Sequence, residues 1–263
     1  MKLDKQWRIL TVGDGDLSFS LALSAQFPPS QLTASIYDSK QVVTEKYAEN
    51  SLHQLQSNQY TVLTEFDVTL ESSWQKLAKQ SIDVVIFQFP LIPAFDNYHD
   101  FKQQTHSVNT LNRRLLRLFI YYAHKYVLDP EGPMLCIITS KDVKPYCEWD
   151  LESSLLIGLD INYLGQSPFN ISDFPGYKIR NVDRDKHVKD TSGISYVWSA
   201  KTHSQDLPHL KLPHYLDANH CSFCRAGPFL TERDKLAHNN SKKHKNMLLH
   251  HQNWLAYLKV ESL

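Results

Sequence analysis

The sequence predicts an α/β fold with a mostly parallel sheet, followed by a small metal-binding module at the C-terminus. Over the first 200 residues, short apolar runs typical of strands alternate with longer stretches of helical pattern. Near the end of the chain, two cysteines and two histidines occur at the spacing of a zinc site. The length of 263 residues accommodates one sizeable domain and one small module.

Each expected strand is a short apolar run, and each interval between strands has a helical pattern. The strands are expected over residues 8–12, 32–37, 60–63 with an exit at 67–68, 83–87, 134–138 and 195–198. The helices are expected over residues 18–27, 42–56, 72–81, 106–128 and 151–159. Pro28 and Pro29 end the first helix. Such alternation favours parallel strands, and parallel sheets bind ligands at the carboxyl ends of their strands.

The domain boundaries are expected where the composition changes. Residues 1–200 form the α/β domain, residues 201–216 the linker, and residues 217–263 the zinc finger with a C-terminal helix. Pro208 and Pro213 stand in a polar setting that is typical of a linker.

Charge is unevenly distributed although the net charge is zero. Residues 201–263 carry a net charge of +4 and eight of the thirteen histidines, and the first 200 residues carry −4. A basic tail of this kind indicates a polyanionic partner, although the asymmetry alone is a weak signal. No apolar run has the length of a membrane span, and the first residues lack the apolar core of a signal peptide. With no disulfide framework, we expect an intracellular protein, cytoplasmic or, in a eukaryote, nucleolar.

The predicted metal ligands are Cys221, Cys224, His238 and His244. Two thiolates and two imidazoles can complete a tetrahedral shell around Zn²⁺. The segment around them is too poor in apolar residues to form a core, so metal binding would supply its folding free energy. The wide spacing between the two histidines resembles the matrin or U1-type finger, which implies contact with structured or double-stranded RNA. A knuckle that only stabilises the C-terminus or binds protein is the alternative.

A glycine turn follows the first expected strand, with the sequence Gly13-Asp14-Gly15-Asp16. Glycine lets a ligand approach the backbone, but two carboxylates would repel a pyrophosphate. They suit the ammonium and ribose groups of S-adenosylmethionine instead. Asp38 after the second strand would accept from the ribose hydroxyls. Asp67 after the third strand would accept from the adenine amino group, with Val68 packing on the ring. Alternatively, each feature is only a turn or a helix cap.

The motif from Ile9 to Leu21 resembles the opening of the large-subunit rRNA (uridine-N3) methyltransferase family. The similarity continues over residues 37–39, 45–47, 67–69, 87–90, 141–149 and 174–180, and so spans roughly residues 8–200. It implies a Rossmann-like methyltransferase that uses S-adenosylmethionine and methylates ribosomal RNA.

The resemblance places the motif Phe87-Gln88-Phe89-Pro90 opposite the methyl group and the target base. The family usually has asparagine at the position of Gln88 and a histidine at the position of Leu91. Gln88 keeps an amide that can bind a uracil edge as donor and acceptor. Leu91 in place of the histidine removes a possible acceptor for the N3 proton.

Two residues after the fifth expected strand are candidates for assisting the reaction, each in a different role. Asp142 is the candidate general base, or it caps the following turn. Lys141 is the candidate for stabilising charge on a uracil oxygen, or it is a solvated lysine. Tyr146 and Trp149 are candidates for stacking on a flipped base, with core packing as the alternative.

The expected RNA contacts are cationic side chains that neutralise phosphates. On the finger they are Arg225, Arg233, Lys235, Lys242, Lys243 and Lys245. In a loop of mixed charge they are Lys178, Arg180 and Arg184, with a solvated charged loop as the alternative. The leading hypothesis is therefore an RNA methyltransferase acting on uridine N3 of ribosomal RNA, with a ribosomal assembly particle as a candidate partner. The alternatives are an RNA-binding protein that has lost the reaction, or a methyltransferase acting on protein or a small molecule.

Overall fold

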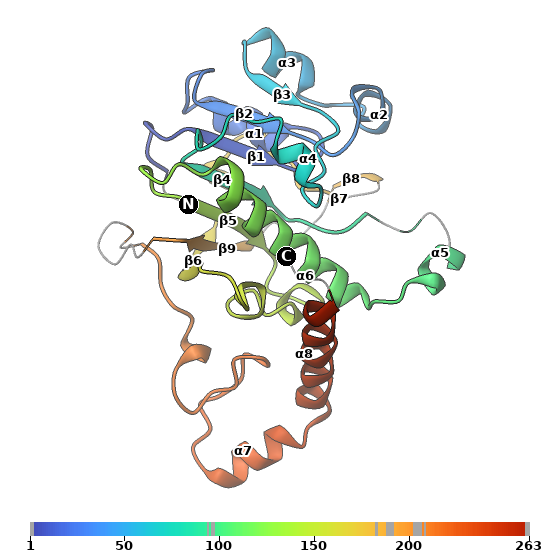
Figure 1. Ribbon diagram of the computed structural model, residues 1–263, viewed down its shortest axis with the longest axis vertical. Coiled ribbons are helices and arrows are strands. Elements are labelled where there is room, and N and C mark those ends of the chain that lie inside the picture. Colours follow the sequence, from blue (N-terminus) through green and yellow to red (C-terminus); the bar gives the residue numbers. More distant parts are fainter. Residues whose placement is uncertain are drawn as a thin grey trace.

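A seven-stranded sheet forms the centre of the computed structural model, which describes residues 3–93, 95, 98–181, 184–187, 192–201, 207 and 209–260 (Figure 1). The strand order is β3-β2-β1-β4-β5-β9-β6. The strands are β1 Ile9–Val12, β2 Leu32–Ser35, β3 Thr61–Leu63, β4 Val84–Gln88, β5 Leu135–Ser140, β6 Asn162–Phe169 and β9 Gly193–Ser199. The first five pair in parallel, and β9 is antiparallel to both β5 and β6. The predicted mostly parallel α/β fold is confirmed.

The helices differ from the expected ones mainly in length. In the first 200 residues they are α1 Ser18–Ser24, α2 Lys40–Lys46, α3 Leu52–Ser57, α4 Glu71–Trp74, α5 Tyr98–Gln103 and α6 Val108–Tyr122. The helix predicted over residues 42–56 is wrong as a single element, because Tyr47 is extended and separates α2 from α3. The helix predicted over residues 151–159 is wrong too, and only a 3₁₀ turn at Ser154–Leu156 forms there.

Two apolar layers cover the sheet, because alternate residues of each strand point to opposite faces. Leu10, Val85 and Phe87 pack on the face that α6 covers, together with Leu116 and Phe119 of that helix. Ile9 and Ile86 pack on the other face, against Phe19 and Leu23 of α1. Both layers are buried, so the sheet is fixed rigidly and its carboxyl edge can hold side chains in position.

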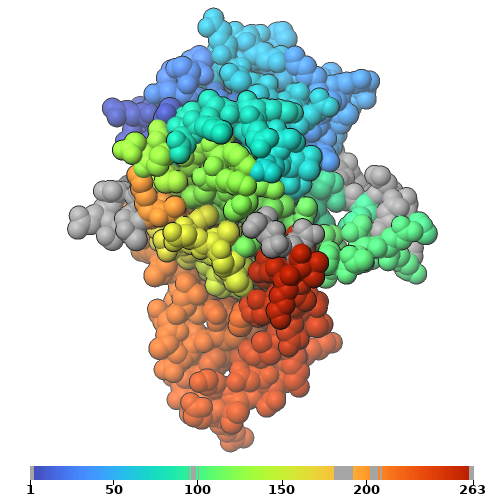
Figure 2. Space-filling model, viewed as in Figure 1, coloured from blue at the N-terminus to red at the C-terminus, as the bar shows by residue number. Residues whose placement is uncertain are grey.

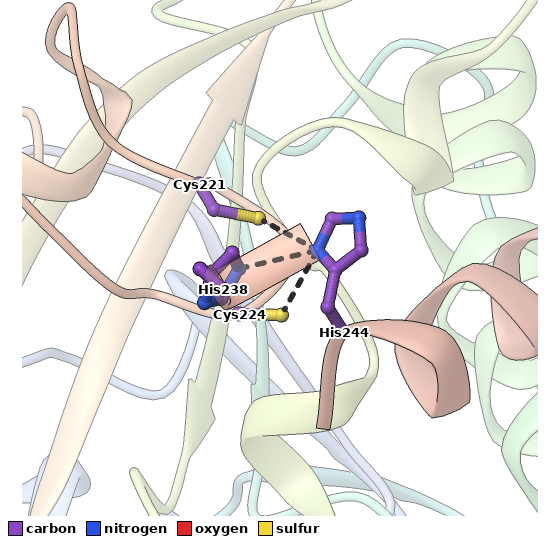
Figure 3. A group of neighbouring side chains, drawn as sticks. All are labelled: Cys221, Cys224, His238 and His244. Carbon is purple, nitrogen blue, oxygen red and sulfur yellow. Dashed lines mark hydrogen bonds between the residues drawn. The ribbon is translucent and has the colours of Figure 1, made fainter. Parts of the chain in front are cut away.

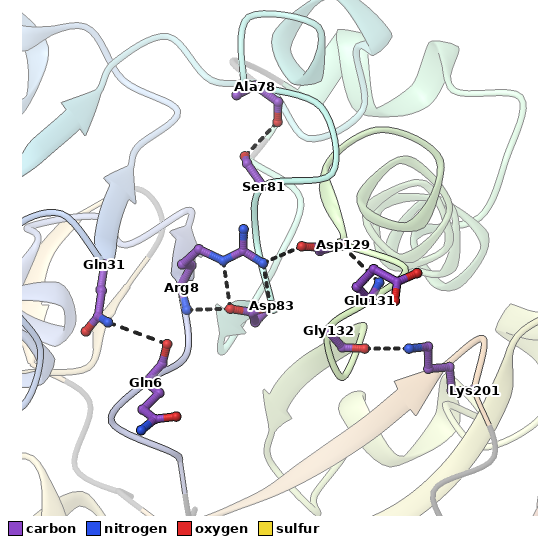
Figure 4. A network of polar contacts seen from close by, with 10 residues as sticks. All are labelled: Gln6, Arg8, Gln31, Ala78, Ser81, Asp83, Asp129, Glu131, Gly132 and Lys201. Carbon is purple, nitrogen blue, oxygen red and sulfur yellow. Dashed lines mark hydrogen bonds and ion pairs between the residues drawn. The ribbon is translucent and has the colours of Figure 1, made fainter.

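An ion cluster closes the amino end of the sheet, away from the glycine turn (Figure 4). The Arg8 guanidinium binds both oxygens of Asp83, at 2.8 and 2.9 Å, and Asp129 Oδ2 at 2.6 Å. The backbone N–H of Arg8 also donates to Asp83 Oδ2 at 2.8 Å. These bonds join the starts of β1 and β4 to the turn before β5, so the cluster is structural.

The C-terminal segment forms a lobe below the sheet in the views of Figures 1 and 2. It contains α7 Glu232–Asn239 and α8 Lys242–Val260. Trp254 of α8 is fully buried, and its indole N–H donates to the backbone oxygen of Ser154 at 2.8 Å. The lobe is thus packed against the α/β domain through α8, which lies beside α6. Among the helices that the structure describes, none combines the length and apolar composition needed to cross a membrane.

Candidate active site and metal centre

A pocket of about 480 Å³ lies at the carboxyl ends of the parallel strands. This volume is in the range of small-molecule sites, which are roughly 300–1,000 Å³. The structure brings all the predicted cofactor residues into its lining: Gly13, Asp14, Gly15, Asp16, Asp38, Asp67 and Val68. Gln88 and Pro90 also line it. One cavity therefore joins the predicted cofactor residues to the predicted substrate motif.

The glycine turn after β1 has no room for side chains. Gly13 has φ +63°, and a Cβ there would lie 2.4 Å from the ring of Phe87. A Cβ on Gly15 would lie 2.9 Å from the hydroxyl of Tyr47. Both glycines are needed because the turn passes directly under aromatic rings that frame the pocket.

The side chain of Asp14 is directed into α1 and caps it. Its Oδ2 accepts from the backbone N–H and the hydroxyl of Ser20, at 2.6 and 2.5 Å, and its Oδ1 accepts from the N–H of Phe19 at 3.3 Å. Burial, with the nearby charge of Asp16, raises the pKa of Asp14 to about 7. We therefore expect Asp14 to shape the turn through its bonds to α1, while its backbone lines the pocket.

Asp16 is paired with a residue that the sequence suggested as an RNA contact. Its Oδ2 accepts from Arg180 Nε at 2.5 Å, and both side chains are largely buried. Lys178, which also lines the pocket, forms an ion pair with Glu49 at 2.5 Å. These two cations sit at the glycine-turn end of the pocket and hold the segment after residue 176 against it.

The two carboxylates after β2 and β3 each bind one neighbouring residue of the protein. Asp38 forms an ion pair with Lys46 at 3.1 Å. Asp67 Oδ1 accepts from the backbone N–H and the hydroxyl of Thr69, at 2.8 and 2.7 Å. Asp67 Oδ2 accepts from none of the described residues, so it is available to a ligand.

Gln88 is the least satisfied polar side chain of the pocket wall. Its amide oxygen and nitrogen are both buried, and neither has a hydrogen-bond partner among the described residues. Phe89, directly after it, has φ +47°, a left-handed conformation that is uncommon for a residue with a side chain. The N–H of Phe89 donates to Thr139 O at 2.8 Å, which holds the strained turn in place. Strain and an unpaired amide in one turn are typical of a binding site.

The structure does not bring Lys141 and Asp142 to this pocket. Both follow β5, yet neither lines the cavity, and the Asp142 carboxylate forms an ion pair with Arg225 of the C-terminal lobe. The candidate general base is thus engaged elsewhere. Trp149 is buried in the core, 5.0 Å from the ring of Tyr146, so this pair is packed as the alternative interpretation expects.

Cys221, Cys224, His238 and His244 converge in the C-terminal lobe (Figure 3). The two Sγ atoms lie 3.5 and 3.6 Å from His244 Nδ1, and His238 Nε2 lies 3.2 Å from the same nitrogen. In a tetrahedral zinc shell with bonds of about 2.0–2.3 Å, ligand atoms are about 3.3–3.8 Å apart. The four side chains therefore fit Zn²⁺, and they would fill its coordination shell.

Arg225, next to Cys224 in sequence, joins this lobe to the α/β domain. Its side chain is only 10% exposed. Its Nη2 donates to Glu152 Oε1 at 2.9 Å and to the Tyr196 hydroxyl at 3.2 Å. The hydroxyl of Tyr215, at the end of the predicted linker, donates to the same Glu152 oxygen at 2.5 Å. Arg225 is therefore engaged inside the protein, and the prediction that it binds RNA phosphates is wrong for this conformation.

The other predicted RNA contacts of the lobe are accessible. Arg233, Lys235, Lys242 and Lys245 are exposed. Lys243 is exposed as well, but its Nζ donates to the backbone oxygen of Cys224 at 2.7 Å, which supports the turn that contains Cys224. Arg184 belongs to the short strand β8 Arg184–His187, and its side chain lies outside the described part of the structure.

Residues 10–181, well over half of the chain, match the family model described as rRNA (uridine-N3-)-methyltransferase BTM5-like. The chain belongs to this BMT5-like family. The family predicted from the motifs is confirmed. The protein is accordingly a methyltransferase that acts on uridine N3 of ribosomal RNA and uses S-adenosylmethionine as its methyl donor.

Two curated proteins of Arabidopsis thaliana are related to this BMT5-like chain. It is 28% identical over 188 residues to "Uncharacterized protein At4g26485", a match that covers 67% of this chain and 87% of the relative. It is 30% identical over 179 residues to "Heavy metal-associated isoprenylated plant protein 41". That second match covers 67% of this chain but only 33% of the relative, so the chain spans one third of that protein.

Among solved structures, the chain is similar to the 30S ribosomal A1408 methyltransferase from an uncultured bacterium. The TM-score is 0.39 at 12% identity, over 77% of this chain and 96% of that one. Precorrin-6y C5,15-methyltransferase from Geobacter metallireducens gives a TM-score of 0.40 at 11% identity, over 76% and 82% of the two chains. Likenesses at these scores bear on neither reaction nor substrate.

Among the residues that line the BMT5-like pocket, Lys46, Tyr47 and Arg114 carry polar groups that the sequence analysis did not assign to the site. Lys46 and Tyr47 lie in a motif that carries the family resemblance, so the sequence held a signal for them. Arg114 of α6 lies in no such motif. Only the packing of α6 against the end of β4 reveals its place in the pocket.

Proposed function

We propose that the pocket binds S-adenosylmethionine along the ends of β1, β2 and β3 and receives the target uracil beside Gln88. The buried, unpaired amide of Gln88 is the observation that carries this assignment. A uracil edge presents carbonyl acceptors on both sides of the N3–H donor. The amide of Gln88 offers one acceptor and two donors, and so complements that edge. Binding the base would supply the hydrogen-bond partners that this amide lacks among the described residues.

In this arrangement the cofactor is fixed by polar groups at the strand ends. Asp38 would accept from the ribose hydroxyls, and the free oxygen of Asp67 would accept from the adenine amino group. The turn from Gly13 to Asp16 would hold the amino acid end. S-adenosylmethionine supplies the methyl group.

The chemical step joins N3 of the uracil to the methyl carbon and breaks the bond between that carbon and sulfur. The N3 proton leaves to solvent, and S-adenosylhomocysteine is the second product. Gln88 and the strained turn at Phe89 and Pro90 would hold N3 in line with the methyl group. Alignment of this kind lowers the barrier without any covalent contribution from the protein. No carboxylate is required as the base, in agreement with the engagement of Asp142 by Arg225.

For the C-terminal lobe we propose a structural zinc ion held by Cys221, Cys224, His238 and His244. Four protein ligands leave no open position, so the metal would stabilise the finger and take no part in the reaction. The exposed cations on α7 and α8 would then neutralise RNA phosphates. We propose domain boundaries near residues 200 and 217, a ribosomal assembly particle as the natural form of the substrate, and the cytoplasm or nucleolus as the compartment.

Transfer of labelled methyl groups to ribosomal RNA tests the pocket assignment. We expect label in 3-methyluridine after nucleoside digestion, and loss of that label in Asp38→Ala together with loss of cofactor binding. Lys79→Ala, a change of an exposed residue outside the pocket, is the control. Undiminished cofactor affinity in Asp38→Ala would contradict the proposed orientation of the cofactor.

A further inference from the structure

Arg114 is the one cation of the pocket lining without an ionic partner among the described residues. Four cationic residues line the pocket: Lys46, Arg114, Lys178 and Arg180. Three of them are neutralised inside the protein, by Asp38, Glu49 and Asp16 respectively. Arg114 is half-buried and forms neither an ion pair nor a hydrogen bond with any residue that the structure describes. A half-buried guanidinium with unused donors is suited to bind an anion from outside.

The position of Arg114 assigns it to the substrate end of the pocket. Leu111, Arg114 and Leu115 of α6 all line the cavity, and their spacing puts them on one face of the helix. Asn112 Oδ1 of the same helix accepts from the N–H of Ile92 at 3.2 Å, which ties α6 to the segment that follows Gln88. Asp38 and Asp67 instead follow β2 and β3, on the other side of β1. Arg114 therefore belongs to the helix that is joined to the segment following Gln88, at the end of the pocket that the proposed uracil site occupies.

We infer that Arg114 binds the phosphate next to the target uridine and is a positioning residue for the RNA. A base inserted beside Gln88 leaves its own phosphates at the pocket entrance, where the planar guanidinium can bind two phosphate oxygens at once. The carboxylate of the cofactor is the other candidate anion. It is expected at the glycine turn, where Lys178 and Arg180 already stand. The inference rests on the proposed place of the uracil at Gln88.

The test compares Arg114→Ala, Arg114→Lys and the charge-matched control Lys79→Ala in steady-state methylation of ribosomal RNA at several salt concentrations. For Arg114→Ala we expect KM for RNA to rise about tenfold or more, because a hydrogen-bonded charge contact is lost. The slope of log KM against log salt should become shallower by about 0.7–0.9, the value of one phosphate contact. We expect kcat and the Kd of S-adenosylmethionine to stay as in the wild type. Arg114→Lys should give a KM for RNA between those of the wild type and Arg114→Ala. Lys79→Ala should leave KM, kcat and the salt dependence unchanged.

Three outcomes would overturn the inference. A weaker Kd for S-adenosylmethionine would assign Arg114 to the cofactor carboxylate. A lower kcat with a pH profile moved to higher pH, at constant KM, would assign it to the charge on the uracil ring. Unchanged kinetics would leave it no role. Gln88→Leu distinguishes a failure of this inference from a failure of the proposed uracil site. If Gln88→Leu is fully active, the placement of the uracil is wrong. If Gln88→Leu is impaired while Arg114→Ala is not, only the role of Arg114 is wrong.

Discussion

The pocket and the C-terminal lobe are organised by different forces. In the pocket, polar side chains stand at the ends of strands whose two faces are buried under apolar layers, so the fold itself holds them in position. In the lobe, most of α7 is exposed, and the potential ligand atoms of the four Cys and His residues lie within 4.8 Å of one another. The cofactor site should therefore persist without metal, whereas the finger should not.

Metal removal should have the largest effect, and it should be confined to the lobe. We expect one zinc ion per chain and, after chelation or in Cys221→Ser, unfolding of the finger with a large loss of RNA affinity. Structural zinc contributes about 10–16 kcal/mol of apparent binding free energy in isolated fingers. Binding of S-adenosylmethionine should remain. Metal analysis, circular dichroism and a cofactor titration measure these three quantities.

Cys147→Ser is the matched control, because Cys147 is a free cysteine outside the cluster. It should keep both metal and RNA affinity. A metal-free protein with an intact finger would show that packing of α8 alone holds the lobe, and the contrast would fail.

Arg225→Met should destabilise the junction between the two regions. Glu152 is buried, and burial raises its pKa even though Arg225 opposes the shift. Removing its cationic partner leaves an uncompensated buried charge, a change that costs about 3–5 kcal/mol of unfolding free energy in other proteins. Denaturant unfolding measures the loss.

Arg233→Met changes an exposed arginine of the same finger and should leave the stability nearly unchanged. Adding Glu152→Gln to Arg225→Met should restore part of the stability. Equal stability of Arg225→Met and wild type would mean that the cluster contributes nothing to docking.

Gln88→Leu should separate chemistry from folding within the pocket. Leucine suits a buried position, so we expect normal stability and normal cofactor affinity. Losing the groups that orient the uracil should lower kcat/KM by about 10²–10³-fold, as for other positioned hydrogen-bond donors. Single-turnover methylation of ribosomal RNA gives the value. Gln88→Asn keeps an amide and should retain more activity than Gln88→Leu. Equal loss in the two variants would indicate that side-chain volume matters there and hydrogen bonding does not.

The two regions also differ in how much their sequence reveals. The convergence of the four Cys and His side chains and the lining of the pocket were predictable because each depends on local spacing: Cys and His intervals in one case, a turn after a strand in the other. Arg225 and Arg114 depend on contacts between segments far apart in the chain. Arg225 meets Glu152, 73 residues away, so nothing in its surroundings distinguishes it from an exposed cation of the finger.

Secondary structure follows the same rule. The central strands β1, β4 and β5 are buried on both faces, so their apolar runs were readable. Strand β6 was missed because it lies at the edge of the sheet and contains Gly165 and Pro168, which weaken a strand pattern. The break between α2 and α3 was missed because Tyr47 leaves the helix to reach the glycine turn, a tertiary contact that local propensity does not encode.

The smallest predicted effect is a pH dependence of stability that originates in the pocket. The pKa of Asp14 is about 7 in the folded protein against an ordinary value of 3.8, because the carboxyl is buried near Asp16. The folded state therefore binds its proton more tightly than the unfolded state does. The stabilisation is complete below pH 3.8 and is lost as pH rises through 7.

Thermal melts of the zinc-loaded protein between pH 5 and 8 should show this decline in the wild type and a flatter curve in Asp14→Asn. Asp129 is the comparison, because Arg8 lowers the pKa of its carboxyl. Asp129→Asn should shift the curve of stability against pH without changing its slope between pH 5 and 8. If Asp14→Asn keeps the slope of the wild type, the pH dependence arises outside the glycine turn, and the carboxylate of Asp14 is ionised in the folded protein.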